Sequence, residues 1–270
     1  MPPVRIVDPK DSRIAEYFAV SEPERARRRG VFVAEGRFVV QRLIEDGRNR
    51  VRSLLLNDAA HRALEPILCA LPAETPVYLA AATEMRAITG FDIHRGCLAV
   101  AERPPEIPVE RLSQSGGILV ILEGVANADN VGGVFRNAAA FGVHAVLLTP
   151  TCGDPLYRKA IRTSMGAVLR VPFARIGQWP AELARIRRNG YSVVALTPRE
   201  SSVTIDEFAS LERPVRVALL IGAEGPGLSE AALSLAAHRV RIPTTNAVDS
   251  LNIAVATGIV LSRLSQTGTL

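Results

Sequence analysis

The second half of the chain alternates short, almost wholly apolar blocks with amphipathic segments. Four such blocks each predict a strand buried on both faces: 118–122, 144–148, 193–196 and 215–221. The short stretch 239–242 predicts a fifth strand. Helical spacing of apolar residues fills the segments between the strands: 131–141, 155–165, 180–188, 229–237 and 251–264. Residues 167–171 predict one more short strand. This alternation predicts an α/β fold with a mainly parallel sheet.

The first part of the chain predicts a separate, smaller α/β unit. Its predicted strands are 51–56, 77–80 and 96–101, and short helices are expected near 14–18 and 22–29. An apolar stretch that begins at 31–35 is expected to turn helical through 38–44. Pro104, Pro105, Pro108 and the pair Gly116–Gly117 then disfavour packed structure. We therefore expect one domain over residues 1–103, a linker over 104–117 and a second domain over 118–270.

Composition indicates the cellular compartment of the protein and disfavours a membrane segment and a metal site. Of 270 residues, 48% are hydrophobic, which is ample for a core, yet no apolar run is long enough for a bilayer. The first residues lack the apolar region of a signal peptide. The cysteines are odd in number and form no CxxC pair: Cys69, Cys97 and Cys152. The four histidines are scattered along the sequence: His61, His94, His144 and His238. We expect a cytoplasmic protein with reduced thiols, no metal site and no membrane segment.

The charge of the chain favours a polyanionic partner. Its formal net charge is +5, with a pI near 9.5, and nearly all its basic residues are arginines. Nine arginines stand against five acidic residues between Glu22 and Arg52. Two interpretations remain open at this point, a solvated helix face and a surface that binds nucleic acid. Codon bias in a GC-rich genome is a further explanation for the arginines.

Three polar loops lie between an apolar block and a predicted helix, at residues 123–130, 222–229 and 243–252. Open α/β sheets bind ligands at such places, where loops leave the carboxyl ends of strands. In the first loop Asn130 is a natural N-cap, and Gly132 lies one turn from Arg136. Gly132 costs roughly 1 kcal/mol in a helix relative to Ala, so it predicts close approach of another backbone or a ligand.

The other two loops carry polar residues of their own. In the second loop Glu224 stands between glycines, and Ser229 predicts a helix cap. In the third, Asp249 or Ser250 predicts the N-cap. Asn252, one residue further on, predicts contact with a ligand or a neighbouring loop.

Together these residues resemble a known family. Three stretches resemble, in order, the signature motifs of the SpoU (TrmH) family: Asn130–Arg136 with Ala138–Gly142, Leu220–Gly227, and Ile242–Pro243 with Ser250–Asn252. The resemblance covers residues 118–266, and the first hundred residues more loosely resemble the family's substrate-binding domain, a ribosomal-protein-like α/β fold. One departure is Asn127-Ala128, where many members carry Asp-Pro.

The resemblance implies an S-adenosylmethionine-dependent RNA 2′-O-ribose methyltransferase of the SPOUT class. It also implies a C-terminal trefoil knot and a homodimer with its active site at or near the subunit interface. Carried to matching positions, it implies cofactor contacts at Leu196, Thr197, Gly222, Ile242 and Leu251. The implied catalytic group is Asn130, Arg136, Glu224, Ser250 and Asn252.

The chemistry sets the expected roles. A guanidinium is always protonated, so Arg136 is expected to clamp phosphate and stabilise the developing alkoxide, and the general base stays open. Ser250 and Asn130 would orient the hydroxyl and the arginine, and Glu224 would fix that arginine or a loop. Because DNA lacks the 2′-hydroxyl, the substrate is expected to be RNA. The two-domain plan favours ribosomal RNA, with transfer RNA as the alternative. RNA contacts are expected at Arg25, Arg27, Arg28, Arg29, Arg37, His94 and Arg95.

Three functions compete at this stage. The first is the ribose methyltransferase, and the second is an RNA-binding protein of the same fold without turnover. The presence of all the expected polar groups disfavours the second. The third, an unrelated nucleotide-binding α/β enzyme, calls for a glycine-rich loop after the first strand, which residues 123–127 lack.

Overall fold

The chain divides into two compact units, each with its own sheet. The computed structural model describes residues 2–18, 23–93, 96–114, 116–199, 201–210, 216–245 and 250–265. One unit consists of Met1–Pro105 with Pro155–Leu169, and the other of Glu106–Asp154 with Arg170–Leu270. The segment 155–169 therefore lies outside the unit formed by its neighbours in the sequence. The two units are called here the mixed-sheet unit and the parallel-sheet unit.

The mixed-sheet unit has five strands in the order β1-β4-β3-β5-β2. They are β1 (Val4–Arg5), β2 (Val31–Glu35), β3 (Val51–Leu56), β4 (Val77–Leu79) and β5 (Cys97–Glu102). β5 runs antiparallel to both β2 and β3, whereas β4 pairs in parallel with β1 and β3. The expected small α/β unit is thus present, and its likeness to a ribosomal protein stays a prediction.

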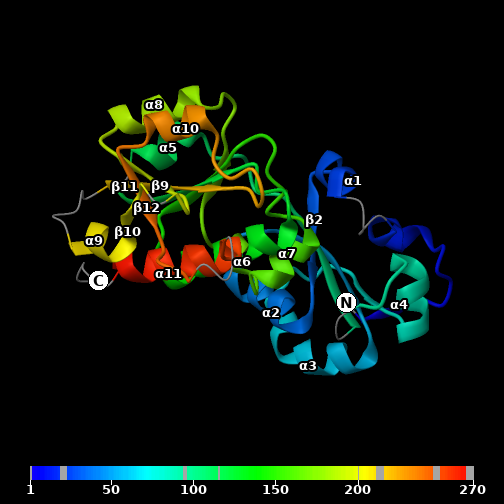
Figure 1. Ribbon diagram of the computed structural model, residues 1–270. Helices are drawn as coiled ribbons and strands as arrows, with labels where there is room; N and C mark the ends of the chain where they lie inside the picture. Colours follow the sequence, from blue (N-terminus) through cyan, green and yellow to red (C-terminus); the bar gives the residue numbers. More distant parts are fainter. Residues whose placement is uncertain are drawn as a thin grey trace. The chain divides into compact units, whose positions relative to one another are not determined.

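Helices surround this sheet (Figure 1). They are the 3-10 helix η1 (Ser12–Tyr17), α1 (Pro23–Arg28), α2 (Arg37–Asp46), α3 (Asp58–Leu68), α4 (Ala82–Thr89), α7 (Arg158–Thr163) and the 3-10 helix η3 (Ala167–Leu169). The strand predicted over 167–171 is wrong, because a turn at Met165 and Gly166, both with positive φ, leads directly into η3.

A buried ion pair attaches α7 to this unit. The carboxylate of Glu35, on β2, has no solvent exposure and accepts a hydrogen bond from Arg158 Nη1 at 2.7 Å. Arg162 Nη1 lies 3.3 Å from its other oxygen, and the guanidinium of Arg158 lies 3.8 Å from the ring centre of Phe91. A buried carboxylate requires such partners, so this contact explains why 155–169 joins the unit that contains β2.

The parallel-sheet unit has seven strands in the order β10-β12-β9-β11-β6-β7-β8. They are β6 (Gly117–Glu123), β7 (Ala145–Leu148), β8 (Phe173–Arg175), β9 (Ser192–Leu196), β10 (Val203–Thr204), β11 (Arg216–Gly222) and β12 (His238–Arg241). Every pairing between neighbours in this order is parallel. The predicted parallel sheet is confirmed, and the carboxyl ends of its strands meet at one edge.

Helices cover both faces of this sheet (Figure 1). One face carries α5 (Val109–Ser113), α8 (Ala181–Arg188) and α10 (Glu230–Leu235), whose apolar side chains join the same core as alternate strand residues. On the other face lie α6 (Ala128–Ala140), α9 (Ile205–Ser210) and α11 (Ile253–Ser265). The trefoil knot stays a prediction.

Helix α5 corrects the interpretation of residues 104–117 as a linker without packed structure. Val109 and Leu112 are three residues apart, so they share one helix face, and both are buried in the core of the parallel-sheet unit. Pro108 stands at the N-cap of this helix, where a missing N–H group costs nothing. The prolines therefore precede the helix and do not interrupt it.

Candidate functional site

A pocket lies at the carboxyl edge of the parallel sheet, beyond β9, β11 and β12. Its lining consists of Leu196, Thr197, Pro198, Ile221, Gly222, Ala223, Glu224, Gly225, Gly227, Ile242, Thr244, Ser250, Leu251, Ile253 and Ala256. All five residues expected to bind the cofactor are in this set. Two residues of the predicted catalytic group, Glu224 and Ser250, line it as well. Sequence reasoning missed the other apolar residues and Thr244, although each lies within a few positions of a predicted one.

The loop after β11 folds back on itself. Ala223 and Gly227 form an isolated antiparallel bridge, in which the Gly227 N–H donates to the Ala223 carbonyl at 3.0 Å. A Cβ placed on Gly222 would lie 2.3 Å from the carbonyl carbon of Gly227, so only glycine fits there. Gly225 and Gly227 have φ values of +82° and +69°, which favour glycine as well. This glycine-rich loop presents Glu224 at the rim of the pocket.

Asn252 connects the three loops. Its Nδ2 donates to Asn130 Oδ1 at 2.9 Å and approaches Glu224 Oε1 at 3.4 Å. Its Oδ1 accepts from the backbone N–H groups of Ala254 and Val255 at 2.9 and 3.4 Å, which caps α11. The expected contact of Asn252 with neighbouring loops is therefore present.

Two predicted helix caps are wrong. Asn127, not Asn130, caps α6: its Oδ1 accepts from the N–H groups of Asp129 and Asn130. Asn130 is consequently a buried residue of the first turn, free to accept from Asn252. Ser250 is exposed and lines the pocket, while Asn252 makes the capping contacts; Asp249 lies outside the described residues. The predicted cap at Ser229 is confirmed, since its Oγ accepts from Ala232 N–H at 3.2 Å.

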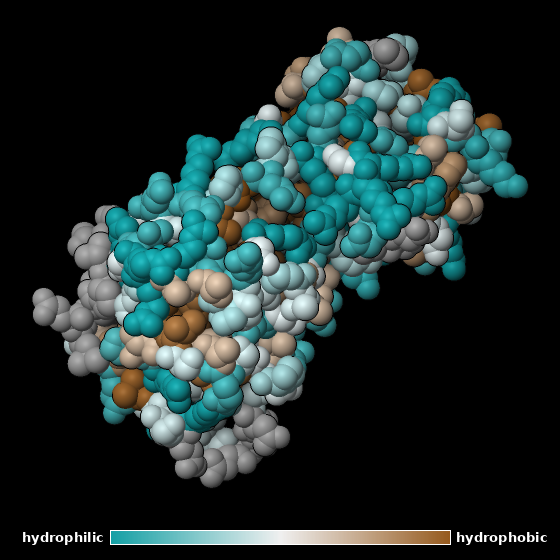
Figure 2. Space-filling model, turned by 90° about the horizontal axis from the view of Figure 1, so that it is seen from above, coloured by the Kyte–Doolittle hydropathy of each residue, from teal (hydrophilic) through white to brown (hydrophobic). Residues whose placement is uncertain are grey.

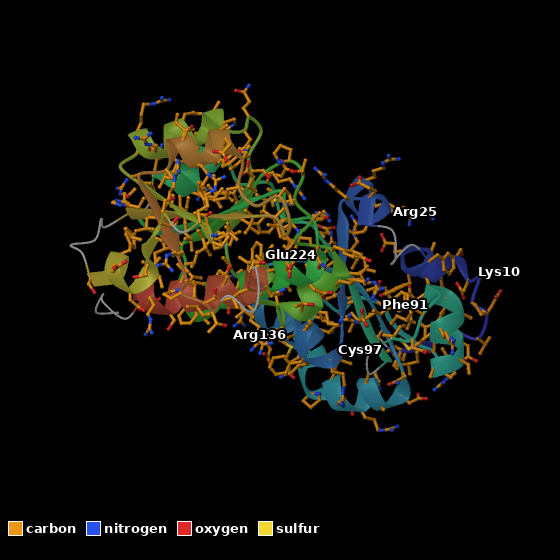
Figure 3. All side chains as sticks on the ribbon, in the orientation of Figure 1. Lys10, Arg25, Phe91, Cys97, Arg136 and Glu224 are labelled. Atoms are coloured by element: carbon orange, nitrogen blue, oxygen red, sulfur yellow. The ribbon has the colours of Figure 1, made fainter. Side chains whose placement is uncertain are left out.

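Arg136 lies on α6 and is exposed (Figure 3). It is not among the residues that line the pocket, and within the described part of the chain no hydrogen bond or ion pair holds its guanidinium. Close approach of another helix occurs at Gly133, where a Cβ would lie 2.5 Å from Ala254 Cβ of α11. Arg136 is therefore available to an anion from outside the protein.

The nine arginines between Glu22 and Arg52, which include five of the expected RNA contacts, divide into two groups. Arg25, Arg27, Arg28 and Arg29 are exposed on or directly after α1, and Arg37 is half-buried at the start of α2. Arg42, Arg48, Arg50 and Arg52 are engaged by carbonyl or carboxylate groups within the protein. His94 and Arg95 lie outside the described residues. On the face shown in Figure 2 hydrophilic residues predominate and hydrophobic ones form small, separate patches.

Two absences concern the ranges that the structure describes. Within them no three His, Cys, Asp or Glu residues lie close enough to hold a metal ion. No helix in these ranges combines the length and apolar character needed to cross a membrane.

Comparison with known proteins identifies the family. Residues 117–262 match the model of the SpoU rRNA Methylase family. The chain belongs to this family. A SpoU relative from Mycobacterium bovis, named an uncharacterized tRNA/rRNA methyltransferase, is 37% identical over 267 residues, covering 97% of this chain and 92% of the relative.

Solved structures share the fold of this SpoU family member. The AdoMet-bound rRNA methyltransferase from Sinorhizobium meliloti has a TM-score of 0.82 at 24% identity, covering 97% of both chains. The SpoU methyltransferase AviRb from Streptomyces viridochromogenes, in complex with the cofactor AdoMet, has a TM-score of 0.77 at 22% identity, covering 95% of this chain and 98% of AviRb. The predicted family and fold class are therefore confirmed.

Proposed function

We propose that this protein transfers a methyl group from S-adenosylmethionine to a ribose 2′-hydroxyl of structured RNA, with ribosomal RNA as the substrate. The carbon–sulfur bond breaks as the carbon–oxygen bond forms, which releases S-adenosylhomocysteine and the proton of the hydroxyl. The observation that carries the proposal is the meeting of the three motif loops. Asn130, Glu224 and Asn252, one from each, are joined by hydrogen bonds beside the pocket that all five expected cofactor residues line.

The pocket fits the cofactor of this family. Its walls combine aliphatic side chains suited to an adenine ring with backbone and hydroxyl groups suited to amino, carboxylate and ribose groups. Leu196, Thr197, Gly222, Ile242 and Leu251 would hold S-adenosylmethionine, which supplies an electrophilic methyl group on sulfur. Because Gly222 leaves no room for a Cβ, the backbone itself forms this wall of the pocket.

The polar residues at the rim position and stabilise the nucleophile. Arg136, permanently charged and exposed, clamps an RNA phosphate and stabilises the alkoxide that develops as the 2′-hydroxyl loses its proton. Asn130 and Ser250 orient the hydroxyl. Glu224, which accepts from Asn252, fixes the loop that carries it. Alignment of two reacting groups can lower the activation barrier by roughly 7–11 kcal/mol.

The mixed-sheet unit supplies the RNA-binding surface in this proposal. Arg25, Arg27, Arg28 and Arg29 are exposed side by side at α1, and Arg37, His94 and Arg95 extend the predicted surface. A separate basic unit suits a large structured RNA, which favours ribosomal over transfer RNA. The protein would work as a cytoplasmic homodimer, a state that light scattering on the purified chain measures directly.

Mapping of methylated riboses tests the function. RNA from a deletion strain and from the wild type would be reverse-transcribed at low nucleotide concentration, and the stops compared. A stop in ribosomal RNA that disappears in the deletion strain is expected. A stop lost from transfer RNA instead would identify transfer RNA as the substrate. If the purified protein binds RNA without incorporating methyl groups, it is a non-catalytic RNA-binding protein.

A further inference from the structure

We propose that Glu123 is a positioning residue that holds the glycine-rich loop in the shape that binds the cofactor. The inference rests on the proposed function and concerns a residue outside the three motifs. Glu123 is the last residue of β6 and pairs in the sheet with Gly222, the last residue of β11. It does not line the pocket, so any effect on the cofactor must pass through other residues.

The carboxylate of Glu123 accepts one hydrogen bond at each oxygen. Oε1 accepts from Trp179 Nε1 at 2.6 Å, and Oε2 accepts from the backbone N–H of Ser229 at 3.0 Å. Trp179 packs against the core of the parallel-sheet unit. The first bond thus aims the carboxylate, and the second attaches it to the point where the glycine-rich loop ends and α10 begins.

Ser229 is the far end of the loop that forms one wall of the pocket. The near end, Gly222, is fixed by its sheet pairing with Glu123, and the residue before it, Ile221, pairs with Leu196 of β9 as well. Between them the bridge of Ala223 with Gly227 folds the loop back on itself, so the loop moves as a unit whose position depends on its two ends. Glu123 therefore fixes the second end of the loop and with it the position of Glu224.

A carboxylate suits this place for an electrostatic reason. The N–H of Ser229 stands at the start of α10, and a charged acceptor makes a stronger bond with it than a neutral one would. Replacing Glu123 by glutamine leaves only one oxygen for two donors. One N–H group must then face the amide NH2 group, and we expect the loop to leave its position.

The experiment measures binding of S-adenosylmethionine to the full chain by calorimetry. Glu123→Gln is expected to raise the Kd about tenfold, the effect of losing one hydrogen bond to a charged group. Trp179→Phe loses the bond that aims the carboxylate but keeps both carboxylate oxygens for Ser229, so it should raise the Kd less than Glu123→Gln does. If Glu123→Gln binds as tightly as the wild type, the proposal is wrong.

A second pair of variants tests the same contact from the loop side. Ser229 has a φ of −65°, the value that proline prefers, so Ser229→Pro removes the N–H donor without demanding a new φ at this residue. Ser229→Ala keeps that N–H and loses only the hydroxyl cap of α10. The proline variant should bind about tenfold more weakly than the alanine variant, at a similar melting temperature.

Equal affinities of these two variants would overturn the role of Glu123. If the wild-type protein itself fails to bind S-adenosylmethionine, the proposed function fails instead, and the two failures are thus distinguishable.

Discussion

The side chains of Asn252 and Asn130, 122 positions apart in the sequence, meet at 2.9 Å between Nδ2 and Oδ1. The same amide of Asn252 caps α11 through its oxygen. The Oδ1 atom of Asn252 thus caps α11, while its Nδ2 atom connects the loops. Substitutions at this position can separate the two.

Asn252→Asp keeps the acceptor for the α11 cap and replaces the donor by a charged oxygen. That oxygen would face Asn130 Oδ1 and Glu224 Oε1, so the three loops should separate. We expect a near-normal melting temperature and methyl transfer slowed ten- to a hundredfold, equivalent to about 1.4–2.7 kcal/mol. Asn252→Ala, by contrast, should also lose about 1 kcal/mol of stability with the cap. Wild-type turnover in the aspartate variant would contradict this account.

Substitution of Arg136 should change the rate of methyl transfer without changing the affinity for the cofactor. Because it does not line the pocket, Arg136→Ala should leave the Kd for S-adenosylmethionine unchanged. Loss of a charge that stabilises the alkoxide should slow single-turnover methyl transfer about 100-fold or more. Arg136→Lys keeps the charge without the bidentate geometry, so its rate should lie between those of the wild type and the alanine variant. A Kd that rises as much as the rate falls would place Arg136 in the cofactor site instead.

The exposed arginines of α1 predict an electrostatic effect on RNA binding. Reversing the charge at Arg27 and Arg28 should weaken binding to RNA at least tenfold and flatten its dependence on salt concentration. Affinity for S-adenosylmethionine should not change. The matched control reverses Arg187 and Arg188, an adjacent exposed pair on α8 in the parallel-sheet unit. Equal losses from both pairs would mean that overall charge, and not this surface, attracts RNA.

The sequence identifies five of the seven strands of the parallel sheet, most of them because they are continuously apolar, but it misses β8 (Phe173–Arg175). The two-residue strand β10 (Val203–Thr204) carries too little pattern to predict. Cap positions were misjudged where two capable residues compete. Asn127 and Asn130 are both good caps, and the contact with Asn252, far along the chain, decides between them.

Nonlocal contacts also explain the other differences. Nothing near residues 155–169 indicates that Glu35 supplies the buried partner of Arg158. Glu123 likewise looks like an ordinary strand end until the fold brings Trp179 and Ser229 to it. The motif residues were found because they sit in loops with unusual glycines, whereas a positioning residue in a strand has no such local mark.

The packing of α6 on α11 predicts that replacing one helical glycine by alanine destabilises the protein, against the usual trend. Ala normally stabilises a helix by roughly 1 kcal/mol relative to Gly. At Gly133, however, the added Cβ would lie 2.5 Å from Ala254 Cβ. We therefore expect Gly133→Ala to lower the melting temperature by several degrees. Adding Ala254→Gly should restore part of the loss, because it makes room for the new methyl group, and strictly additive effects would contradict direct contact.

The three thiols predict a simple reactivity pattern and a pH effect. Cys69 is exposed, whereas Cys97 and Cys152 are buried. Burial raises the pKa of the Cys97 thiol to about 12, so it stays protonated and unreactive at pH 8. A disulfide reagent should therefore modify one thiol rapidly in the native protein and three after unfolding, and Cys69→Ser should abolish the rapid reaction.

The same shift in the pKa of Cys97 links this thiol to stability. An unfolded cysteine releases its proton near pH 8.5, roughly its ordinary pKa, whereas the folded one holds it until about pH 12. The contribution of Cys97 to stability is therefore complete below the first value and declines as pH rises toward the second. Urea unfolding between pH 8 and 11 should show a steeper loss of stability for the wild type than for Cys97→Ala. Identical slopes would mean that Cys97 ionises in the folded protein as readily as in the unfolded chain.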